Sequence, residues 1–315
     1  MIHNKASLLL LSTIFAKSVV GVFWNMTGYT YCHDPVVYEE DGKYYGFCTG
    51  DGIQVIKSED GGKKWEFAGQ IFDSPLKEWD DAVPPHQGSM DVWAPDIEYY
   101  NGRVWLYYSL STFNSGTSAI FLASAESVGT GSWRNDGLIL KSAADDFNAI
   151  DPNLVIDKEG NPWLAWGSHW RGLKIARVDP ETMQLTGDFT TIARRSSYEN
   201  PIEAPSIIYN KEHDYYYLFV SIDYCCVGVD STYKMVVSRS KKITGPYLDK
   251  EGNPIIDTKN AGTIFDTGND RYVAVGHQDV DQKIIARHGY DAEDNGASHL
   301  LINDLKFDKD GWPTY

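Results

Sequence analysis

HDPVVYEEDGKYYGF, residues 33–47, is the first of five related stretches in this chain. The next three are APDIEYYNGRVWLYY (94–108), IDPNLVIDKEGNPWLAW (150–166) and EAPSIIYNKEHDYYYLF (203–219), and a looser fifth reads GTIFDTGNDRYVAVGH (262–277). Their anchor residues are Pro35, Pro95, Pro152, Pro205 and Thr263, so the period is roughly 53 to 60 residues. A period of this size is typical of a propeller or a solenoid.

Each stretch contains an apolar run, a polar turn and an aromatic-rich run, which predicts a β-hairpin. A further apolar run follows each of them: IQVIKS (53–58), AIFLAS (119–124), LKIARV (173–178), KMVVSRS (234–240) and KIIARH (283–288). Three or four short strands per repeat match one blade of a propeller. The sequence therefore predicts an all-β fold, a five-bladed β-propeller that forms one domain over residues 25–315, with its active site at one mouth of the central channel.

The composition agrees with this fold and restricts the ligand. The chain of 315 residues is 42% hydrophobic and 13% aromatic, which suits a large core built of strands. Its net charge of −16 argues against nucleic acid and against polyanionic substrates, because both require a basic surface. An uncharged polysaccharide is compatible with this charge.

Residues 1–24 have the pattern of a signal peptide or leader rather than of a folded element. Lys5 precedes the apolar stretch Ala6–Ala16, which is too short to span a bilayer. Ala16, Ser18 and Gly21 offer small residues for cleavage. We therefore expect a secreted protein that has no membrane attachment after processing. Residues 25–27, Asn-Met-Thr, form a glycosylation sequon that matters only in a eukaryotic secretory host.

The four cysteines carry less information. Cys32 and Cys48 fall on neighbouring segments of the first repeat and are candidates for a disulfide in an oxidising compartment. Cys225 and Cys226 are adjacent, which is unfavourable geometry for a bridge between them, and we expect two small buried side chains instead. The spacing of the four matches no zinc site.

Three carboxylates occur in phase with the repeat. Asp34, Asp151 and Glu203 precede an anchor proline by one or two residues, and proline restricts the residue before it to extended geometry. First strands line the axis of a propeller, so these three groups are expected to face one pocket. A single Asp before a strand is usually a turn former, but unrelated turn formers would not share a phase. Asp96 follows its proline instead, and we expect it to point away from the axis.

Several motifs resemble glycoside hydrolase family 43. They are HDP (33–35), VWAPDI (92–97), NAIDPNLV (148–155), IEAPSI (202–207), CCVGVDSTY (225–233) and GHQ (276–278). Within this family the chain is most similar to the endo-1,5-α-L-arabinanases, over about residues 30–312. The resemblance implies an inverting hydrolase that acts on arabinan and arabino-oligosaccharides.

The resemblance also implies the roles of the three carboxylates. Asp34 would be the general base, Glu203 the general acid, and Asp151 a like charge that raises the pKa of Glu203 and orients the sugar. Inverting hydrolysis requires one carboxylate to activate water and one carboxylic acid to protonate the leaving oxygen, so these residue types suit the reaction.

The family places an axial histidine beside a calcium ion or a water molecule, and His277 of GHQ matches it at the end of the expected second strand of the fifth blade. We therefore expect calcium in the central channel, with water completing the ligand shell, because calcium prefers oxygen ligands. No organic cofactor is expected. By the same similarity, the substrate-contacting candidates are Trp93, Phe113, Asn148, Ser168, His169 and Trp170.

Two alternatives stay open at this point. An exo-acting β-xylosidase or α-L-arabinofuranosidase of the same family would carry the same carboxylates and differ in whether a loop blocks one end of the cleft. A non-catalytic glycan-binding propeller would not need carboxylates in phase. We expect a monomer in either case.

Overall fold

The computed structural model describes residues 23–113, 116–142, 146–197 and 199–315. Its elements there are almost all strands, so the protein is an all-β structure, as predicted. The helices of the described ranges are α1 (Lys77–Ala82) and the 3-10 turns η1 (Pro84–His86), η2 (Val128–Thr130) and η3 (Gly228–Asp230). None of the helices in the described ranges is long and apolar enough to cross a bilayer. The expected leader, residues 1–24, lies outside the described residues except for Phe23 and Trp24.

The strands form five antiparallel units in chain order, which we number 1 to 5. Unit 1 comprises β2 (His33–Glu40), β3 (Lys43–Asp51), β4 (Gln54–Ser58) and β5 (Lys64–Gln70), and unit 2 comprises β6 (Asp91–Tyr100), β7 (Arg103–Leu110), β8 (Ala119–Ala125) and β9 (Arg134–Lys141). Unit 3 comprises β10 (Asn153–Ile156), β11 (Pro162–Trp166), β12 (Leu173–Val178) and β13 (Leu185–Arg195). Unit 4 comprises β14 (Ile202–Asn210), β15 (Tyr215–Ile222), β16 (Lys234–Ser240) and β18 (Thr263–Asp266), and unit 5 comprises β19 (Tyr272–Val280), β20 (Ile284–Asp291) and β21 (Ala297–Asp304).

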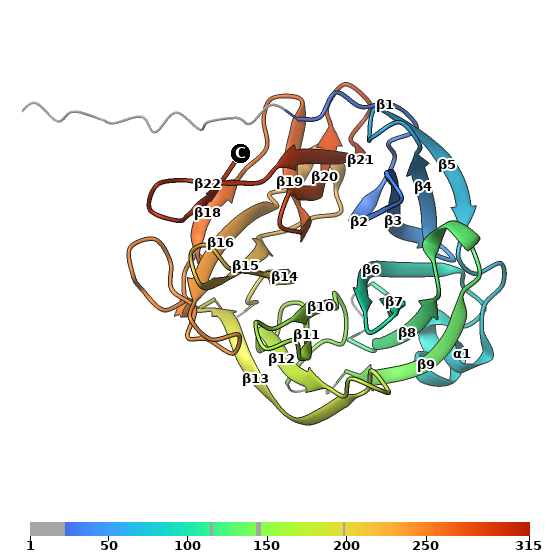
Figure 1. Ribbon diagram of the computed structural model, residues 1–315, viewed down its shortest axis with the longest axis horizontal. Coiled ribbons are helices and arrows are strands. Elements are labelled where there is room, and N and C mark those ends of the chain that lie inside the picture. The colour runs from blue at the N-terminus through green and yellow to red at the C-terminus, as the bar shows by residue number, and fades with distance from the viewer. Residues whose placement is uncertain (1–22, 114–115, 143–145, 198) are drawn as a thin grey trace, which may run out of the picture.

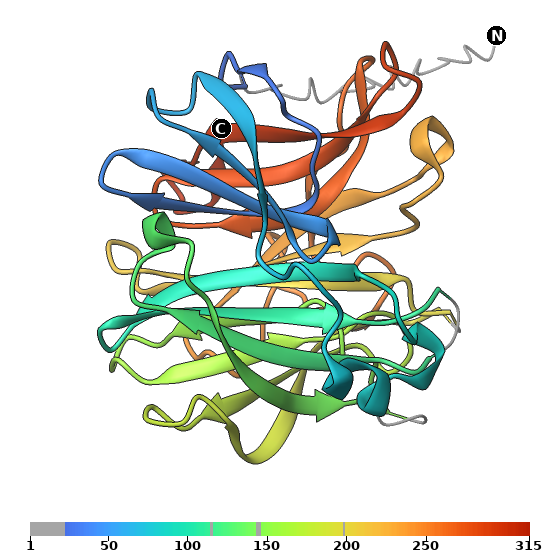
Figure 2. The same ribbon diagram turned by 90° about the vertical axis from the view of Figure 1, so that its right-hand side faces the viewer.

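Short strands extend these units or stand beside them. β1 (Thr27–Gly28) runs parallel to β5, β17 (Ile256–Thr258) runs parallel to β13, and β22 (Lys306–Phe307) pairs with β23 (Pro313–Thr314). Units 1 and 2 share one nine-stranded sheet, because β3 also pairs with β6 over two residues. The five units surround a common centre, with β2, β6, β10, β14 and β19 as the inner strands (Figure 1). From the side, units 1 and 2 lie one above the other in blue and in teal to green (Figure 2).

The core is divided into five main clusters, and each one fills the space between two successive units. Val36 of unit 1 and Leu106 of unit 2 belong to one cluster, and Ile208 of unit 4 and Val275 of unit 5 belong to another. Two further clusters join units 2 and 3 and units 3 and 4. Cys48 and Trp65 of unit 1 pack with Ala286 and Ile302 of unit 5, so the last unit also packs against the first. A sheet between two neighbours buries both of its faces, which explains the nearly continuous apolar runs of β7 and β8.

Five left-handed residues, one from each unit, occupy equivalent places in the inner strand or just ahead of it: Asp34, Ala94, Asp151, Ala204 and His277, with φ between 46° and 56°. The pairing register with the next strand shifts at this point in units 1, 2, 4 and 5. In all five, the N–H group donates to a side chain of the preceding unit. The acceptors are His288 Nδ1, Thr49 Oγ1, Ser109 Oγ, Asp151 Oδ2 and Ser221 Oγ, at 2.9–3.2 Å. These bonds form a complete circuit from unit 1 to unit 5 and back.

This position corrects one expectation. The residues before Pro35, Pro95, Pro152 and Pro205 are left-handed and not extended, because the register shift turns the backbone and a neighbouring side chain captures the freed N–H group. Glu203 does not share the position of Asp34 and Asp151. It lies one residue earlier, beside the left-handed Ala204.

The fifth repeat is also placed differently from its prediction. Thr263 begins β18, the outer strand of unit 4, and the inner strand of unit 5 is β19, which contains His277. His277 is therefore in a first strand rather than at the end of a second. The fifth inner strand lacks the proline that marks the other four. Without this marker, the sequence pattern predicts the inner strand of unit 5 at β18 instead of at β19.

The first described residues lie along the last strand of unit 5. Trp24 N–H donates to the Ile302 carbonyl at 2.8 Å, and Leu300 N–H donates to the Thr30 carbonyl at 2.8 Å. The Trp24 indole also donates to Asp304 at 2.9 Å. The start of the described chain is therefore bonded to the last strand of unit 5.

Candidate active site

A pocket of about 850 Å³ lies at the starts of the inner strands. All ten residues predicted to form the site line it: Asp34, Trp93, Phe113, Asn148, Asp151, Ser168, His169, Trp170, Glu203 and His277. Asp34 belongs to β2, Trp93 to β6, Glu203 to β14 and His277 to β19, and the others lie in loops. The fold thus brings these residues together, while their individual roles stay predictions.

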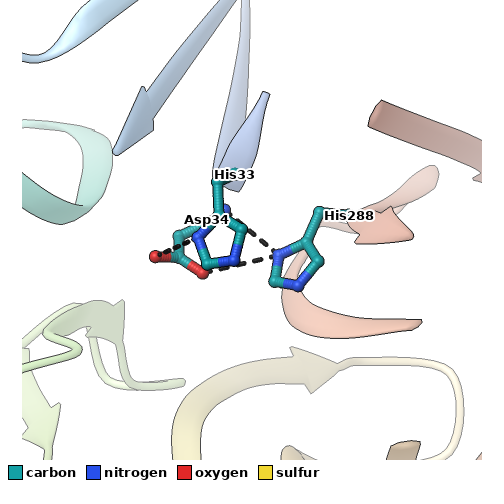
Figure 3. A group of neighbouring side chains, drawn as sticks. All are labelled: His33, Asp34 and His288. Carbon is teal, nitrogen blue, oxygen red and sulfur yellow. Dashed lines mark hydrogen bonds and ion pairs between the residues drawn. The ribbon is translucent and has the colours of Figure 1, made fainter. Parts of the chain in front are cut away.

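Asp34 is enclosed by a hydroxyl group and three histidines. Thr49 Oγ1 donates to Asp34 Oδ2 at 2.6 Å, and His33 Nδ1 lies 3.0 Å from the same oxygen. His277 Nδ1 lies 3.1 Å from Oδ1. His288 Nδ1 accepts the Asp34 N–H at 3.2 Å, and Figure 3 shows the contacts of Asp34 with both His33 and His288. The carboxylate is thus fixed from both of its oxygens and from its own backbone.

These contacts favour the ionised form of Asp34. Burial by itself would raise the pKa of Asp34, but its contacts with His277 and His33 outweigh burial and hold that pKa well below its ordinary range. Burial likewise opposes the charge on His33, yet the neighbouring Asp34 raises the pKa of His33. Burial lowers the pKa of His277, although the neighbouring Asp34 opposes this shift. Both histidines thus stabilise the ionised carboxylate of Asp34.

His33, Asp34 and His288 also offer ligand atoms within 4.8 Å of one another, which raises the question of a metal. The His33 and His288 rings are stacked at 4.1 Å with 20° between their planes, so their nitrogen lone pairs do not converge on one point. Burial lowers the pKa of His288 to about 3, and its Nδ1 is occupied by the Asp34 N–H. We therefore interpret this group as a hydrogen-bonded support for Asp34.

Asp151 lies ahead of β10 with its side chain turned toward unit 4. Its Oδ2 accepts the Ala204 N–H at 3.1 Å, and its own N–H donates to Ser109 Oγ at 3.1 Å. Burial, and after it repulsion from Glu203 and Asp34, raises the pKa of Asp151 well above its ordinary value. Asp151 therefore tends to keep a proton under conditions in which Asp34 is ionised.

Glu203 lies in the same wall of the pocket. Ser168 Oγ donates to Glu203 Oε2 at 2.7 Å, and His169 Nε2 lies 3.7 Å from that oxygen. One carboxylate oxygen is thus held by the loop that follows β11. The charge of Glu203 is in turn one of the groups that raise the pKa of Asp151.

Asp96 was expected to point away from the axis, and the structure shows otherwise. It stays out of the pocket, but it lines a much smaller cavity that also contacts Asp151 and His277. Its carboxylate accepts Leu154 N–H at 2.6 Å and the Asn153 amide at 3.0 Å. Burial raises the pKa of Asp96 to about 7. Asp96 therefore links units 2 and 3.

Aromatic rings form one side of the pocket. Trp93 and Phe113 approach edge to face with centroids 6.4 Å apart, and the Trp93 indole donates to Asp91 at 2.7 Å. Phe113 is 70% exposed, which leaves its ring free to cover the apolar face of a sugar.

Asn148 adds a polar group to the pocket. Its side-chain oxygen accepts hydrogen bonds from the Ser118 and Ser142 hydroxyls at 2.7 and 3.2 Å.

The cysteines confirm one prediction and contradict another. Cys32 and Cys48 form a disulfide with their Cα atoms 5.4 Å apart. Cys225 and Cys226 are also bonded to each other, although their Cα atoms are 3.8 Å apart, the spacing across one peptide bond. Cys226 is exposed and both cysteines line the pocket, so the expectation of buried free thiols was wrong.

Other pocket residues were missed by sequence reasoning. His33, Glu199 and Tyr224 line the pocket, and the Tyr224 hydroxyl donates to Glu199. His33 precedes Asp34 in the HDP motif and could have been found there. His288 supports Asp34 from the far end of the chain, where no motif marks it.

Hydrolysis of a glycosidic bond by two carboxyl groups requires one that is ionised and one that retains a proton. Asp34 favours its ionised form, Asp151 favours its protonated form, and both line one pocket with Glu203, which defines the class of the protein as glycoside hydrolase. Residues 26–313 of the sequence match the protein family described as "Glycosyl hydrolases family 43". The chain belongs to this family and is an enzyme, as the resemblance predicted.

Known members of the family match along nearly the whole chain. The extracellular endo-α-(1→5)-L-arabinanase 1 of Bacillus subtilis is 45% identical over 322 residues, which cover 100% of this chain and 97% of that protein. The extracellular exo-α-(1→5)-L-arabinofuranosidase ArbA of Cellvibrio japonicus is 36% identical over 304 residues, which cover 89% and 85%. The solved family 43 endo-arabinanase from Bacillus licheniformis is 53% identical, with a TM-score of 0.89 over 93% of this chain and 100% of that chain.

Proposed function

We propose that the enzyme hydrolyses α-1,5-L-arabinofuranosidic linkages within arabinan and acts outside the cell. The observation that carries this proposal is the match over almost the whole chain to proteins named as endo-arabinanases, at 45% and 53% identity. The net charge of −16 suits a neutral polysaccharide and arabino-oligosaccharides. Membership of a hydrolase family decides against the alternative of a non-catalytic binding propeller.

The scaffold of this enzyme is a five-bladed β-propeller, with units 1 to 5 as its blades. The clusters between successive units, including units 5 and 1, support this proposal. The circuit of bonds from the five left-handed residues supports it too. Residues 25–315 then form one monomeric domain. A leader that ends at Ala16, Ser18 or Gly21 would leave the Trp24 bonds intact.

In the proposed mechanism Asp34 is the general base and Glu203 the general acid. Water attacks the anomeric carbon while Asp34 takes its proton, and Glu203 protonates the oxygen of the departing sugar. The carboxylates of Asp151 and Glu203 repel each other, and Asp151 Oδ2 accepts the N–H of Ala204, the residue that follows Glu203. Attack by water from the base side inverts the anomeric configuration.

The Glu203→Gln variant tests this mechanism, because Gln keeps the shape and the Ser168 contact but carries no transferable proton. We expect hydrolysis of linear arabinan to fall by at least about 100-fold, while arabino-oligosaccharide binding persists. Proton NMR of the first wild-type products should show inversion. Products of retained configuration, or a fully active variant, would contradict the assignment.

An exo-acting enzyme is the second candidate, because the relative from Cellvibrio japonicus carries that description at 36% identity. Product analysis separates the two. An endo enzyme releases short arabino-oligosaccharides from debranched arabinan, with little action on p-nitrophenyl arabinofuranoside. Release of one product size from the first turnovers would favour the exo candidate, as would monosaccharide alone.

We also propose that His277 binds a calcium ion whose remaining ligands are water. His277 Nδ1 is engaged with Asp34, and the ring lines both cavities, so Nε2 is the nitrogen left for an ion. The ion would add positive charge near Asp34. We expect calcium to raise Tm by a few degrees relative to protein treated with EDTA, and His277→Ala to abolish the difference. Equal Tm values for wild-type protein in calcium and in EDTA would refute this proposal.

A further inference from the structure

We propose that the disulfide between Cys225 and Cys226 is a sugar-binding surface of the pocket, where it covers the apolar face of the sugar unit beside Asp34. This inference rests on the proposed function, since the sugar is taken to be arabinofuranose. Nothing in the mechanism above uses this disulfide.

The disulfide lies on the loop between β15 and β16 and faces the same pocket as the three carboxylates. Cys226 is exposed, and Cys225 is half-buried against the cluster of Tyr233, Ala274 and Tyr290. Cys226 Sγ lies 4.0 Å from His33 Nε2, and His33 Nδ1 lies 3.0 Å from Asp34. One sulfur is thus separated from the proposed base by a single side chain.

A bridge between neighbours has little value as a crosslink. The stabilisation that a disulfide gives through the unfolded chain grows with the length of the closed loop. Cys32 and Cys48 are 16 residues apart and close a real loop, whereas Cys225 and Cys226 are 1 residue apart. Global stability therefore does not account for the second disulfide, and its effect must be local.

The loop holds the sulfurs in a fixed place. Cys226 N–H donates to the Tyr290 hydroxyl at 2.8 Å, and that hydroxyl lies 3.0 Å from His33 Nε2. At the base of the loop, Thr232 N–H donates to the Tyr224 carbonyl at 2.8 Å. A surface that is already ordered loses little conformational entropy when a ligand covers it.

The chemistry of the bonded pair suits the apolar side of a sugar. Oxidation removes two S–H groups and leaves polarisable sulfur in a rigid eight-membered ring, which can contact C–H groups without needing a hydrogen bond. Trp93 and Phe113 of unit 2 offer an apolar surface elsewhere in the pocket. The disulfide supplies a second one from unit 4, on the side of Asp34. It therefore contacts the sugar whose anomeric carbon is attacked.

The double variants C225A/C226A and C225S/C226S test the proposal on debranched arabinan and on short arabino-oligosaccharides. Loss of about 50 Å² of covered apolar surface is expected to raise KM about tenfold for every substrate length, with kcat within twofold of wild type. Tm should change by less than about 2 °C, because no sizeable loop is released. Val229→Ser is the matched control, since Val229 is 48% exposed on the same loop but does not line the pocket.

Three results would overturn the proposal. Unchanged KM in both double variants would mean that the sulfurs touch no sugar. A lower kcat at constant KM would mean that the disulfide acts by holding His33 and Asp34. A fall in Tm of more than about 5 °C would make it a structural crosslink. Wild-type enzyme that failed to cleave arabinan would refute the proposed function separately, and the variants would then be assayed on the polysaccharide that it does cleave.

Discussion

Asp34 and Asp151 occupy the same left-handed position in units 1 and 3, yet they prefer opposite protonation states. The difference comes from their neighbours. Asp34 is surrounded by His33, His277 and the Thr49 hydroxyl, which favour the ionised form. Asp151 is buried without such donors to its carboxylate beyond the Ala204 N–H within the described ranges, and burial together with the facing Glu203 favours its protonated form. The same backbone position thus holds one carboxyl group that favours its ionised form and one that favours its proton.

The Asp151→Asn variant should be more stable than wild type and much less active. Because the pKa of Asp151 is higher in the folded than in the unfolded protein, wild-type stability falls as pH rises from about 4 toward the folded value. Asn keeps the acceptor for Ala204 N–H and removes this loss. We expect a Tm gain of roughly 2–4 °C at pH 8 and little gain at pH 4, measured by thermal unfolding. An equal gain at both pH values would contradict a protonation effect.

The three carboxylates could be found from sequence because they lie in phase with a repeat and beside a marker residue, proline. His288 could not, because its role depends on unit 5 meeting unit 1. It occupies the register position that Thr49, Ser109 and Ser221 hold in units 1, 2 and 4, and accepts the Asp34 N–H with a ring nitrogen instead of a hydroxyl. Only the alignment of strands in space shows this equivalence.

At the scale of elements, the inner strands share a left-handed backbone position, whereas the side chain at that position varies. The left-handed residue is Asp, Ala or His, and its N–H group is bonded in every unit. The next side chains along the strand add bonds of the same kind, as Asp279 does to Val37 N–H at 2.9 Å and Ser206 does to Val280 N–H at 3.2 Å. These hydrogen bonds from the N–H groups fix the backbone of the inner strands without involving the side chain of the residue that donates, which is therefore free to vary.

The Cys32–Cys48 disulfide should stabilise unit 1. It joins the residue before β2 to β3, within the cluster between units 5 and 1. A loop of this length predicts a loss of about 3 kcal/mol of unfolding free energy for C32A/C48A in urea. C225A/C226A is the control and should lose far less. Similar losses in both variants would contradict the dependence on loop length.

The elements of the first four repeats were predictable because an apolar run, a turn and an aromatic run recur in phase with proline. The fifth was misplaced because its inner strand has Gln278 where the others have proline. The adjacent disulfide was missed for another reason. General limits on Cα spacing exclude neighbours, and only the folded loop shows that they are bonded.

At the scale of the molecule, the joint between the first and last units depends on the N-terminal segment. Trp24 donates twice to β21, and its ring meets Tyr44 of unit 1 at 5.4 Å. Trp24→Ala should cost about 2 kcal/mol of unfolding free energy, measured by chemical denaturation, since a large packed ring is lost at a closing contact. Tyr99→Ala is the control, because Tyr99 is 52% exposed, and should cost no more than about 0.5 kcal/mol. Equal costs would show that Trp24 does not help to close the ring.

The circuit of N–H donations has a consequence for cooperativity. An open array of repeats can fray from its ends, because a terminal repeat has only one neighbour. Here each unit is bonded and packed on two sides, so unfolding any one of them exposes two apolar clusters at once. The pocket is lined from all five units. Partly unfolded states would therefore lack an intact binding site. Activity and global folding should consequently be lost together.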